Sequence, residues 1–209
     1  MARKRKTALY AGVGIFLVFI FFSYLVHKNI FTSLDFNTTV RLQDHLPQRL
    51  DGPFSFLSDI GKFEIVSILL LIILAIYRKL RGIIVLVFFI GFHAVEVFGK
   101  TFVSHLPPPH FMLRTHDVFS FPQFYVSTQN SYPSGHSARA LFLTTVLFVL
   151  IWNNKKLSHT QKMMILAVLI VYDTAMMVSR IYLGEHWLSD VIGGGLLGLA
   201  CGLLGAAFI

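Results

Sequence analysis

The sequence predicts an all-α polytopic membrane protein with six transmembrane helices plus one interfacial amphipathic helix, in a single domain over residues 1–209. Three observations predict this class. Of the 209 residues, 55% are apolar and only 13% are charged, whereas soluble domains carry roughly 25% charged residues. Several apolar stretches approach the roughly 20 residues that a helix needs to cross a bilayer. The basic residues gather in short stretches between them. The high apolar and low charged content excludes an ordinary soluble domain and a disordered chain.

The first predicted transmembrane helix runs from Thr7 to Val26 and follows four basic residues at positions 3–6. Such a segment is either a secretory signal peptide or a membrane anchor. We expect a retained anchor, because the apolar part is longer than the core of a signal peptide. In addition, no small-x-small cleavage site precedes His27.

Five further apolar stretches predict the remaining transmembrane helices: Ile60 to Tyr77, Gly82 to Phe98, Ser137 to Trp152, Lys162 to Tyr182 and Trp187 to Ile209. Between the first two spans, Phe31 to Phe56 alternates apolar and charged residues in a pattern typical of an interfacial amphipathic helix. Between the third and fourth spans, the loop from Thr101 to Tyr132 is rich in proline and histidine. Loops of this length usually carry function.

The basic residues predict the orientation of the chain. Ten of the 18 lie in three short segments, at positions 3–6, 78–81 and 155–162. Short basic segments stay cytoplasmic, so both termini are expected in the cytoplasm, in a plasma (inner) membrane. The net charge of +8 then indicates topology and attraction to anionic lipid, with no nucleic-acid partner. The single cysteine excludes a disulfide within one chain.

Three polar groups of residues interrupt the apolar background, and the predicted topology places all of them at the outer ends of spans. The first is Lys100 and the six residues after it, the second is residues 132–137, and the third is residues 179–190. Charged residues are costly near the membrane and usually mark function. This coincidence predicts an active site on the outer face.

The second group has features of a phosphate site. Ser134 and Gly135 precede a helical stretch, where an N-cap hydroxyl, unpaired backbone N–H groups and the positive end of the helix dipole favour an anion. Gly135 has no side chain, so it lets a ligand approach closely.

The third group has features of a nucleophile and its support. His186 and Asp190 are four residues apart, on one face of a helix. A carboxylate on one ring nitrogen leaves the other free to attack phosphorus. Arg180 and Lys100 can bind phosphoryl oxygens and stabilise charge in the transition state. His136 can transfer the proton to the leaving oxygen.

These residues resemble the type 2 phosphatidic acid phosphatase (PAP2) superfamily of membrane lipid phosphatases. Its P-S-G-H motif matches residues 133–136, and its S-R-x5-H-x3-D motif matches residues 179–190. The resemblance implies a reaction without metal or other cofactor, in which His186 forms a phosphohistidine, Asp190 supports it and His136 protonates the leaving group. It implies that the phosphate is held by Lys100, Ser134, Gly135 and Arg180.

The first family motif, K-x6-R-P, is incomplete. Lys100 is present, but Pro107 stands where the motif has arginine. A missing guanidinium contact costs about 1.5–3 kcal/mol of binding free energy unless another group replaces it. Arg114, in the same loop, is the first candidate for that replacement, and Arg139, one turn into the fourth span, is the second.

Other polar residues leave alternatives open. The loop residues His105, His110, His116 and Asp117 could form a metal site, but their irregular spacing favours solvated histidines.

Within the spans, Glu96 either pairs with Lys100 or packs against another helix. Asp173 either stabilises the bundle or acts on Arg180. The glycines at 193–195, 198 and 202 indicate close helix packing rather than a cofactor loop.

The sequence therefore predicts an enzyme that removes a phosphate from a lipid phosphate or diphosphate at the outer face, with the substrate and the bilayer as its partners. A polyprenyl diphosphate such as the undecaprenyl carrier is preferred over phosphatidylglycerol phosphate and phosphatidic acid, on family breadth alone. The alternatives are a lipid phosphotransferase of the same fold, a transporter of anions or lipids, and a catalytically inactive scaffold.

Overall fold

The computed structural model describes residues 2–77, 82–116 and 129–209. The basic segment predicted at residues 78–81, and Asp117 of the loop, lie outside the described residues. Across the described ranges, every regular element is helical, which confirms the all-α class. The elements are α1 (Ala2–His27), α2 (Thr32–His45), η1 (Gln48–Leu50), α3 (Asp51–Ile60), α4 (Phe63–Tyr77), α5 (Gly82–Phe102), η2 (His110–Met112), α6 (Gly135–Asn153), α7 (His159–Tyr182) and α8 (Leu188–Ala206).

The described residues contain five or six candidate membrane spans, against the predicted six. Five described helices are long and apolar enough to cross a bilayer, namely α1, α5, α6, α7 and α8. The number of candidate spans rises to six if the bent pair in which residues 48–60 meet α4 at 53° is counted as one span. The break falls at Gly61 and Lys62, so α4 alone is shorter than the predicted span from Ile60.

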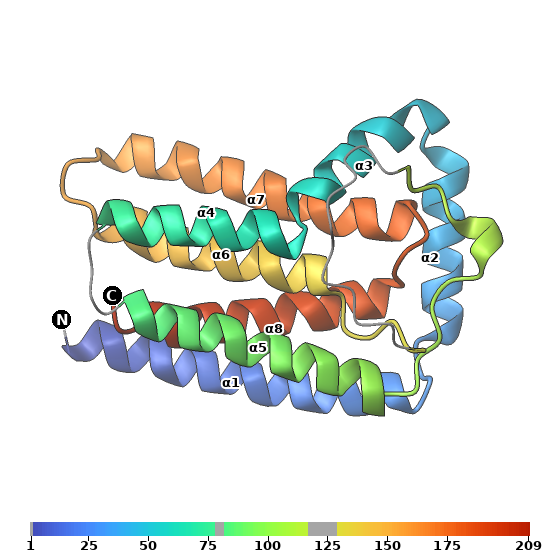
Figure 1. Ribbon diagram of the computed structural model, residues 1–209, viewed down its shortest axis with the longest axis horizontal. Coiled ribbons are helices and arrows are strands. Elements are labelled where there is room, and N and C mark those ends of the chain that lie inside the picture. Colours follow the sequence, from blue (N-terminus) through green and yellow to red (C-terminus); the bar gives the residue numbers. More distant parts are fainter. Residues whose placement is uncertain (1, 78–81, 117–128) are drawn as a thin grey trace.

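The amphipathic segment differs from the prediction because two helices replace one. α2 ends at His45, and Leu46 is extended, with ψ of 131°. Pro47 explains the break, since proline has no N–H to donate and drives the residue before it out of the helical region. The chain turns at this point and continues through η1 into α3. α2 consequently lies across one end of the bundle (Figure 1).

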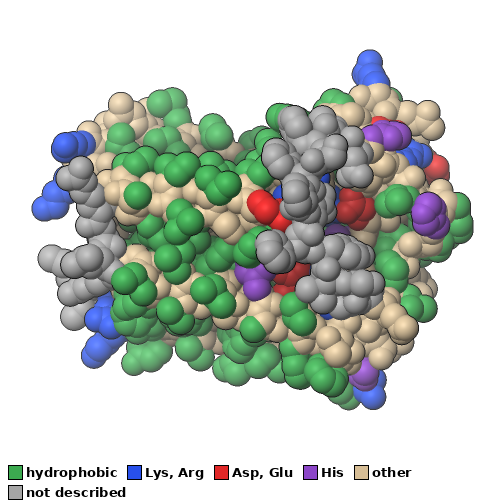
Figure 2. Space-filling model, in the orientation of Figure 1, with side chains coloured by type: hydrophobic (Ala, Val, Ile, Leu, Met, Phe, Trp, Pro, Cys, Tyr) green, Lys and Arg blue, Asp and Glu red, His purple; other side chains and the backbone are tan. Residues whose placement is uncertain are grey.

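The core forms around α8, which packs most extensively on α6 and then on α1 and α5. Gly194 and Gly198 allow this, because a Cβ atom at either position would overlap the α6 backbone at Ser134 or Ala138. The predicted packing role of the glycine stretch is thereby supported. The flank of the bundle carries mainly hydrophobic side chains (Figure 2), as a lipid-facing surface requires.

Both termini and the α6–α7 connection lie at one end of the bundle, and α2 lies at the other (Figure 1). The ends of α5 and α7 and the starts of α6 and α8 meet near α2. This end therefore holds all three polar groups of residues that the sequence singles out.

Candidate active site

His186 and Asp190 are paired at the start of α8. His186 lies two residues before Leu188, the first residue of α8, and its Nδ1 is 3.4 Å from Asp190 Oδ2. The backbone N–H of Trp187 donates to the same oxygen at 3.0 Å, so the carboxylate is held against the helix N-terminus. Asp190 is fully buried. This arrangement leaves His186 Nε2 as the ring nitrogen that can act as a nucleophile.

The environment of His186 favours its neutral form. Burial lowers the pKa of His186, and the hydrogen bond and charge of Asp190 oppose this shift only in part. The positive charges of Arg180 and Lys100 lower the pKa further. A neutral imidazole keeps the lone pair that nucleophilic attack requires.

His136 lies close to the residues around His186. The charges of Arg180, Arg139, His186 and Lys100 all act on its ring. Its Nε2 is buried and has no hydrogen-bond partner among the described residues. Buried polar atoms are nearly always paired, so this nitrogen is available to form a hydrogen bond with a bound group.

Lys100 is paired within its own helix. Its Nζ lies 3.0 Å from Oε1 of Glu96, one turn earlier in α5. Arg139 Nη1 lies 3.7 Å from the other oxygen of Glu96, and Arg139 Nε donates to the Gly61 carbonyl at 2.8 Å. Of the two alternatives for Glu96, the structure therefore shows pairing with Lys100.

The start of α6 differs in detail from the expected phosphate loop. The Ser134 N–H donates to the carbonyl oxygen of Asp190 at 3.0 Å, and the Ser137 hydroxyl donates to Ser134 Oγ at 3.2 Å. The group that approaches Gly135 closely is the Glu96 carboxylate, which a Cβ atom at Gly135 would overlap. The backbone N–H of Ser134 thus serves to join α6 to α8.

Arg180 is completely buried at the end of α7. It donates to Ser58 Oγ and forms an ion pair with Glu185. Its Nε has no hydrogen-bond partner in the described ranges. A buried guanidinium with an unused donor is suited to an additional anionic oxygen.

The described contacts of Arg114 include neither Lys100 nor Glu96, so its role as the replacement for the missing motif arginine stays a prediction. Its Nη1 donates to Tyr182 Oη at 3.2 Å, and its guanidinium lies over the Tyr182 ring, 5.2 Å from the centroid. Its backbone N–H donates to the Leu183 carbonyl at 2.9 Å. Stacking on the tyrosine holds the side chain there. The second candidate, Arg139, is the one that the structure places beside Lys100.

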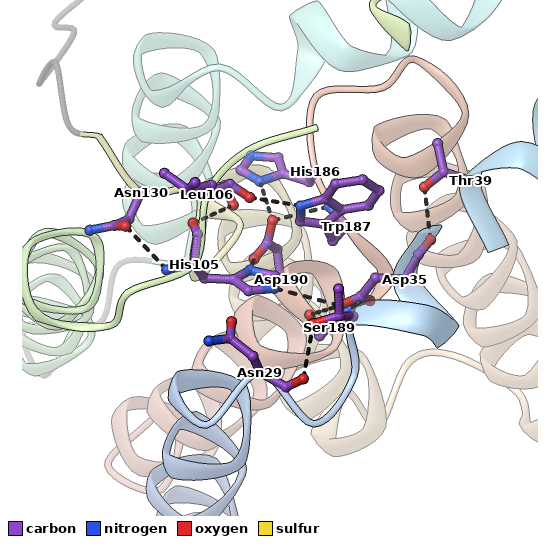
Figure 3. Close-up of polar contacts among 12 residues, drawn as sticks. Asn29, Asp35, Thr39, His105, Leu106, Asn130, His186, Trp187, Ser189 and Asp190 are labelled. Atoms are coloured by element: carbon purple, nitrogen blue, oxygen red, sulfur yellow. Dashed lines mark hydrogen bonds and ion pairs between the residues drawn. The ribbon is translucent and has the colours of Figure 1, made fainter. Parts of the chain in front are cut away.

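The loop histidines behave differently from one another. His110 and His116 are exposed, as expected, but His105 is only 7% exposed, so the prediction of a solvated side chain is wrong for this residue. Its Nδ1 lies 2.8 Å from Asp190 Oδ1 (Figure 3). The described residues contain no group of three or more metal-ligand side chains arranged to hold an ion.

Sequence reasoning missed both His105 and Asp35 as parts of this cluster. Asp35 is 2% exposed and accepts hydrogen bonds from the N–H and hydroxyl of Ser189. The only signal for His105 is its place between Lys100 and the prolines. No signal exists for Asp35, because it meets Ser189 across 154 residues of sequence.

Asp173 lies elsewhere in the bundle. Its Oδ2 accepts a hydrogen bond from Thr144 Oγ1 at 2.8 Å. This contact joins α6 to α7, so of the two alternatives the structure supports a role in the bundle.

A match to a known family gives this cluster its context. Residues 65–209, more than half of the chain, match the PAP2 superfamily. This protein belongs to the PAP2 superfamily. Its helices and family membership make it an integral membrane protein.

Two curated relatives in this superfamily are phosphatases by name. Undecaprenyl-diphosphatase of Sulfolobus acidocaldarius is 34% identical over 151 residues, which cover 71% of this chain and 66% of that protein, just under two thirds. Phosphatidylglycerophosphatase B of Bacillus subtilis is 26% identical over 195 residues, 91% of each chain.

Two solved structures share the fold of this chain. A transmembrane PAP2 type phosphatidylglycerolphosphate phosphatase from Bacillus subtilis has a TM-score of 0.76 at 22% identity, over 94% of both chains. LpxE of Aquifex aeolicus has a TM-score of 0.62 at 27% identity, over 82% of this chain and 94% of that chain. The helical arrangement described above is therefore that of the superfamily.

Proposed function

We propose that this protein hydrolyses a lipid phosphate or diphosphate through a phosphohistidine formed on His186, without a metal ion. The observation that carries the proposal is the meeting of three separated stretches at one place. Asp190 supports His186 at 3.4 Å, and the charges of Lys100, Arg180 and His186 all act on the His136 ring.

In the first step, His186 Nε2 attacks phosphorus and forms a P–N bond, while the P–O bond to the lipid, or to its remaining phosphate, breaks. His136 gives its proton to the leaving oxygen. Lys100, Arg139 and Arg180 bind the other phosphoryl oxygens and stabilise the charge that develops on them. Phosphate binding at Lys100 and Arg180 replaces part of their contacts with Glu96 and Glu185.

In the second step, water attacks phosphorus and the P–N bond breaks. His136 now accepts a proton from the water, and inorganic phosphate is released. Asp190 compensates the positive charge that the His186 ring carries in the intermediate, because its Oδ2 faces the ring N–H at Nδ1. The same two histidines therefore serve both halves of the reaction.

We further propose a polyprenyl diphosphate as the preferred substrate, acted on at the outer face of a plasma (inner) membrane. The 34% identity to a protein named undecaprenyl-diphosphatase supports this substrate class. Phosphatidylglycerol phosphate is the second candidate, because the relative with that activity in its name matches 91% of the chain. The basic Lys155 and Lys156 fall in the α6–α7 connection, at the end of the bundle with the termini, which supports cytoplasmic termini and an outer active site.

The test is release of inorganic phosphate in detergent with EDTA present, from a polyprenyl diphosphate, phosphatidylglycerol phosphate and phosphatidic acid. The intact protein is expected to be active, and His186→Ala to lose all activity above background. His110→Ala is the matched control, since it removes an exposed histidine outside the cluster, and it should keep full activity. A requirement for a divalent metal, or activity in His186→Ala, would refute the mechanism.

A further inference from the structure

His105 lies within the first family motif, between Lys100 and Pro107, and the residues just before α6 hold its backbone in place. Its backbone N–H donates to Asn130 Oδ1 at 3.1 Å. Its carbonyl oxygen accepts hydrogen bonds from the N–H and the hydroxyl of Ser131, at 2.9 and 3.1 Å. Three backbone contacts of this kind leave the side chain little freedom of direction, and the ring points inward toward α8 (Figure 3).

The ring of His105 lies between two buried carboxylates. Nδ1 is 2.8 Å from Asp190 Oδ1, and Nε2 is 3.6 Å from Asp35 Oδ2. A neutral imidazole has one N–H and would turn a lone pair toward one of these anions, whereas a protonated ring gives a donor to each. Burial alone lowers the pKa of His105, but the hydrogen bonds and charges of Asp190 and Asp35 outweigh it and raise the pKa to about 9.

The two oxygens of Asp190 consequently have separate partners. Oδ1 faces His105, and Oδ2 faces His186 and the N–H of Trp187. Asp190 is therefore fixed from both sides. Rotation of the carboxylate away from His186 would break the shorter contact with His105, at 2.8 Å.

Asp35 completes the arrangement from α2. It accepts from the N–H and hydroxyl of Ser189, at 2.8 and 2.7 Å, and so it is anchored to the first turn of α8, next to Asp190. Because Ser189 precedes Asp190 in α8, these bonds fix Asp35 relative to Asp190. Asp35 can therefore hold the Nε2 side of the His105 ring.

Building on the proposed phosphatase function, we infer that His105 is a positioning residue for the reaction: it holds Asp190 Oδ1 so that Oδ2 remains on His186 Nδ1. His105 does not touch the phosphoryl group in this assignment. It acts through Asp190, and Asp35 holds it in place.

Two isosteric substitutions separate the two contacts of the ring. The amide nitrogen of His105→Asn can take the place of Nδ1 and donate to Asp190, whereas that of His105→Gln can take the place of Nε2 and reach only Asp35. We expect His105→Ala and His105→Gln to lower kcat by about 10- to 100-fold, with KM changed less than threefold. His105→Asn should keep kcat within about fivefold of the intact protein.

The experiment measures kcat and KM with a short-chain polyprenyl diphosphate and with short-chain phosphatidic acid, per folded molecule, using full-length protein in detergent with EDTA. In the Asp190→Asn background, His105→Ala should cause no further loss of kcat, because its effect passes through that carboxylate. A merely structural role would lower the folded fraction of the variants. It would leave kcat per folded molecule the same in His105→Ala, His105→Gln and His105→Asn.

Three results would overturn the inference: unchanged kcat in both His105→Ala and His105→Gln, a loss in His105→Asn as large as in His105→Ala, or additive losses with Asp190→Asn. If the Ala and Gln variants do not fold, Asp35→Asn and His105→Asn decide the question. The inference requires both to keep kcat within about fivefold, since Asp190 retains its donor in each. No phosphate release by the intact protein on any substrate of the panel would instead refute the proposed function.

Discussion

Arg180 forms an ion pair with Glu185 inside the candidate site. Glu185 directly precedes His186, the proposed nucleophile. The Arg180 side chain is completely buried, while that of Glu185 is 25% exposed and also accepts from the Thr115 hydroxyl at 2.5 Å. A phosphate that binds Arg180 must compete with this carboxylate. Glu185 therefore sets how strongly the guanidinium is available to a substrate.

Substitution of Glu185 by Gln should strengthen substrate binding. The amide oxygen still accepts from Arg180 but carries no charge, so we expect KM to fall by about three- to tenfold with kcat within twofold of the intact protein. Steady-state kinetics in detergent measures both. Asp44→Asn, at an exposed position of α2, is the control and should change neither constant. A raised KM in Glu185→Gln would show that the carboxylate assists binding instead.

Arg139, rather than Arg114, should supply the guanidinium that the first motif lacks. Arg139 lies beside Lys100 and Glu96, whereas Arg114 stacks on Tyr182. Arg139→Gln should raise KM by about tenfold or more, and Arg114→Gln by less than threefold. Thermal unfolding of both variants checks for structural damage, because Arg139 also binds the Gly61 carbonyl. The reverse order of the two effects would contradict the assignment.

The pH dependence of kcat/KM should reflect the lowered pKa of His186. The free enzyme reacts with His186 neutral, and burial places its pKa below the ordinary value of 6.5. The rate constant should therefore hold as the pH falls from 8 to 6.5 and decline only below that range. The profile is measured with a substrate whose own ionisation is titrated separately. An acidic midpoint above pH 7 would disagree with a neutral nucleophile.

Stability should fall at alkaline pH because of His105. Its pKa in the folded protein, about 9, lies above the unfolded value of 6.5. Its contribution is complete below pH 6.5 and is lost as the pH rises through 9. After solvent screening, we expect on the order of 1–2 kcal/mol, seen as a lower unfolding temperature at pH 9.5 than at pH 6.5. His105→Asn should show a smaller drop, and an equal drop would count against this origin.

The contact between α6 and α8 should tolerate no side chain at Gly198. A Cβ atom there would overlap the Ala138 carbonyl, so Gly198→Ala should destabilise the fold by about 1–3 kcal/mol. Gly14→Ala in α1 is the matched control, because no atom lies within 4 Å of its Cβ position. Thermal unfolding in detergent compares the two variants, and equal unfolding temperatures would show that the helices can separate at little cost.

Several features of the fold follow from local chemistry and were therefore predictable. The apolar stretches fix the spans, because an unpaired backbone N–H or C=O group is costly in lipid and a helix pairs these groups within a single segment. The break at Pro47, by contrast, depends on one residue within an amphipathic pattern, and the prediction of a single helix there was wrong. The pairing of His186 with Asp190 was predictable because the two residues are only four positions apart, at the start of α8.

By itself, the sequence determined the all-α membrane fold and the motifs of the superfamily, since apolar length, proline placement and short-range spacing act within about 20 residues. Only the tertiary structure decided the partners of those motifs. His105 reaches Asp190 across 85 residues and Asp35 reaches Ser189 across 154. Arg139 shares Glu96 with Lys100 for the same reason. Which side chains share a buried site depends on how the helices pack, and no local pattern encodes which distant residues meet.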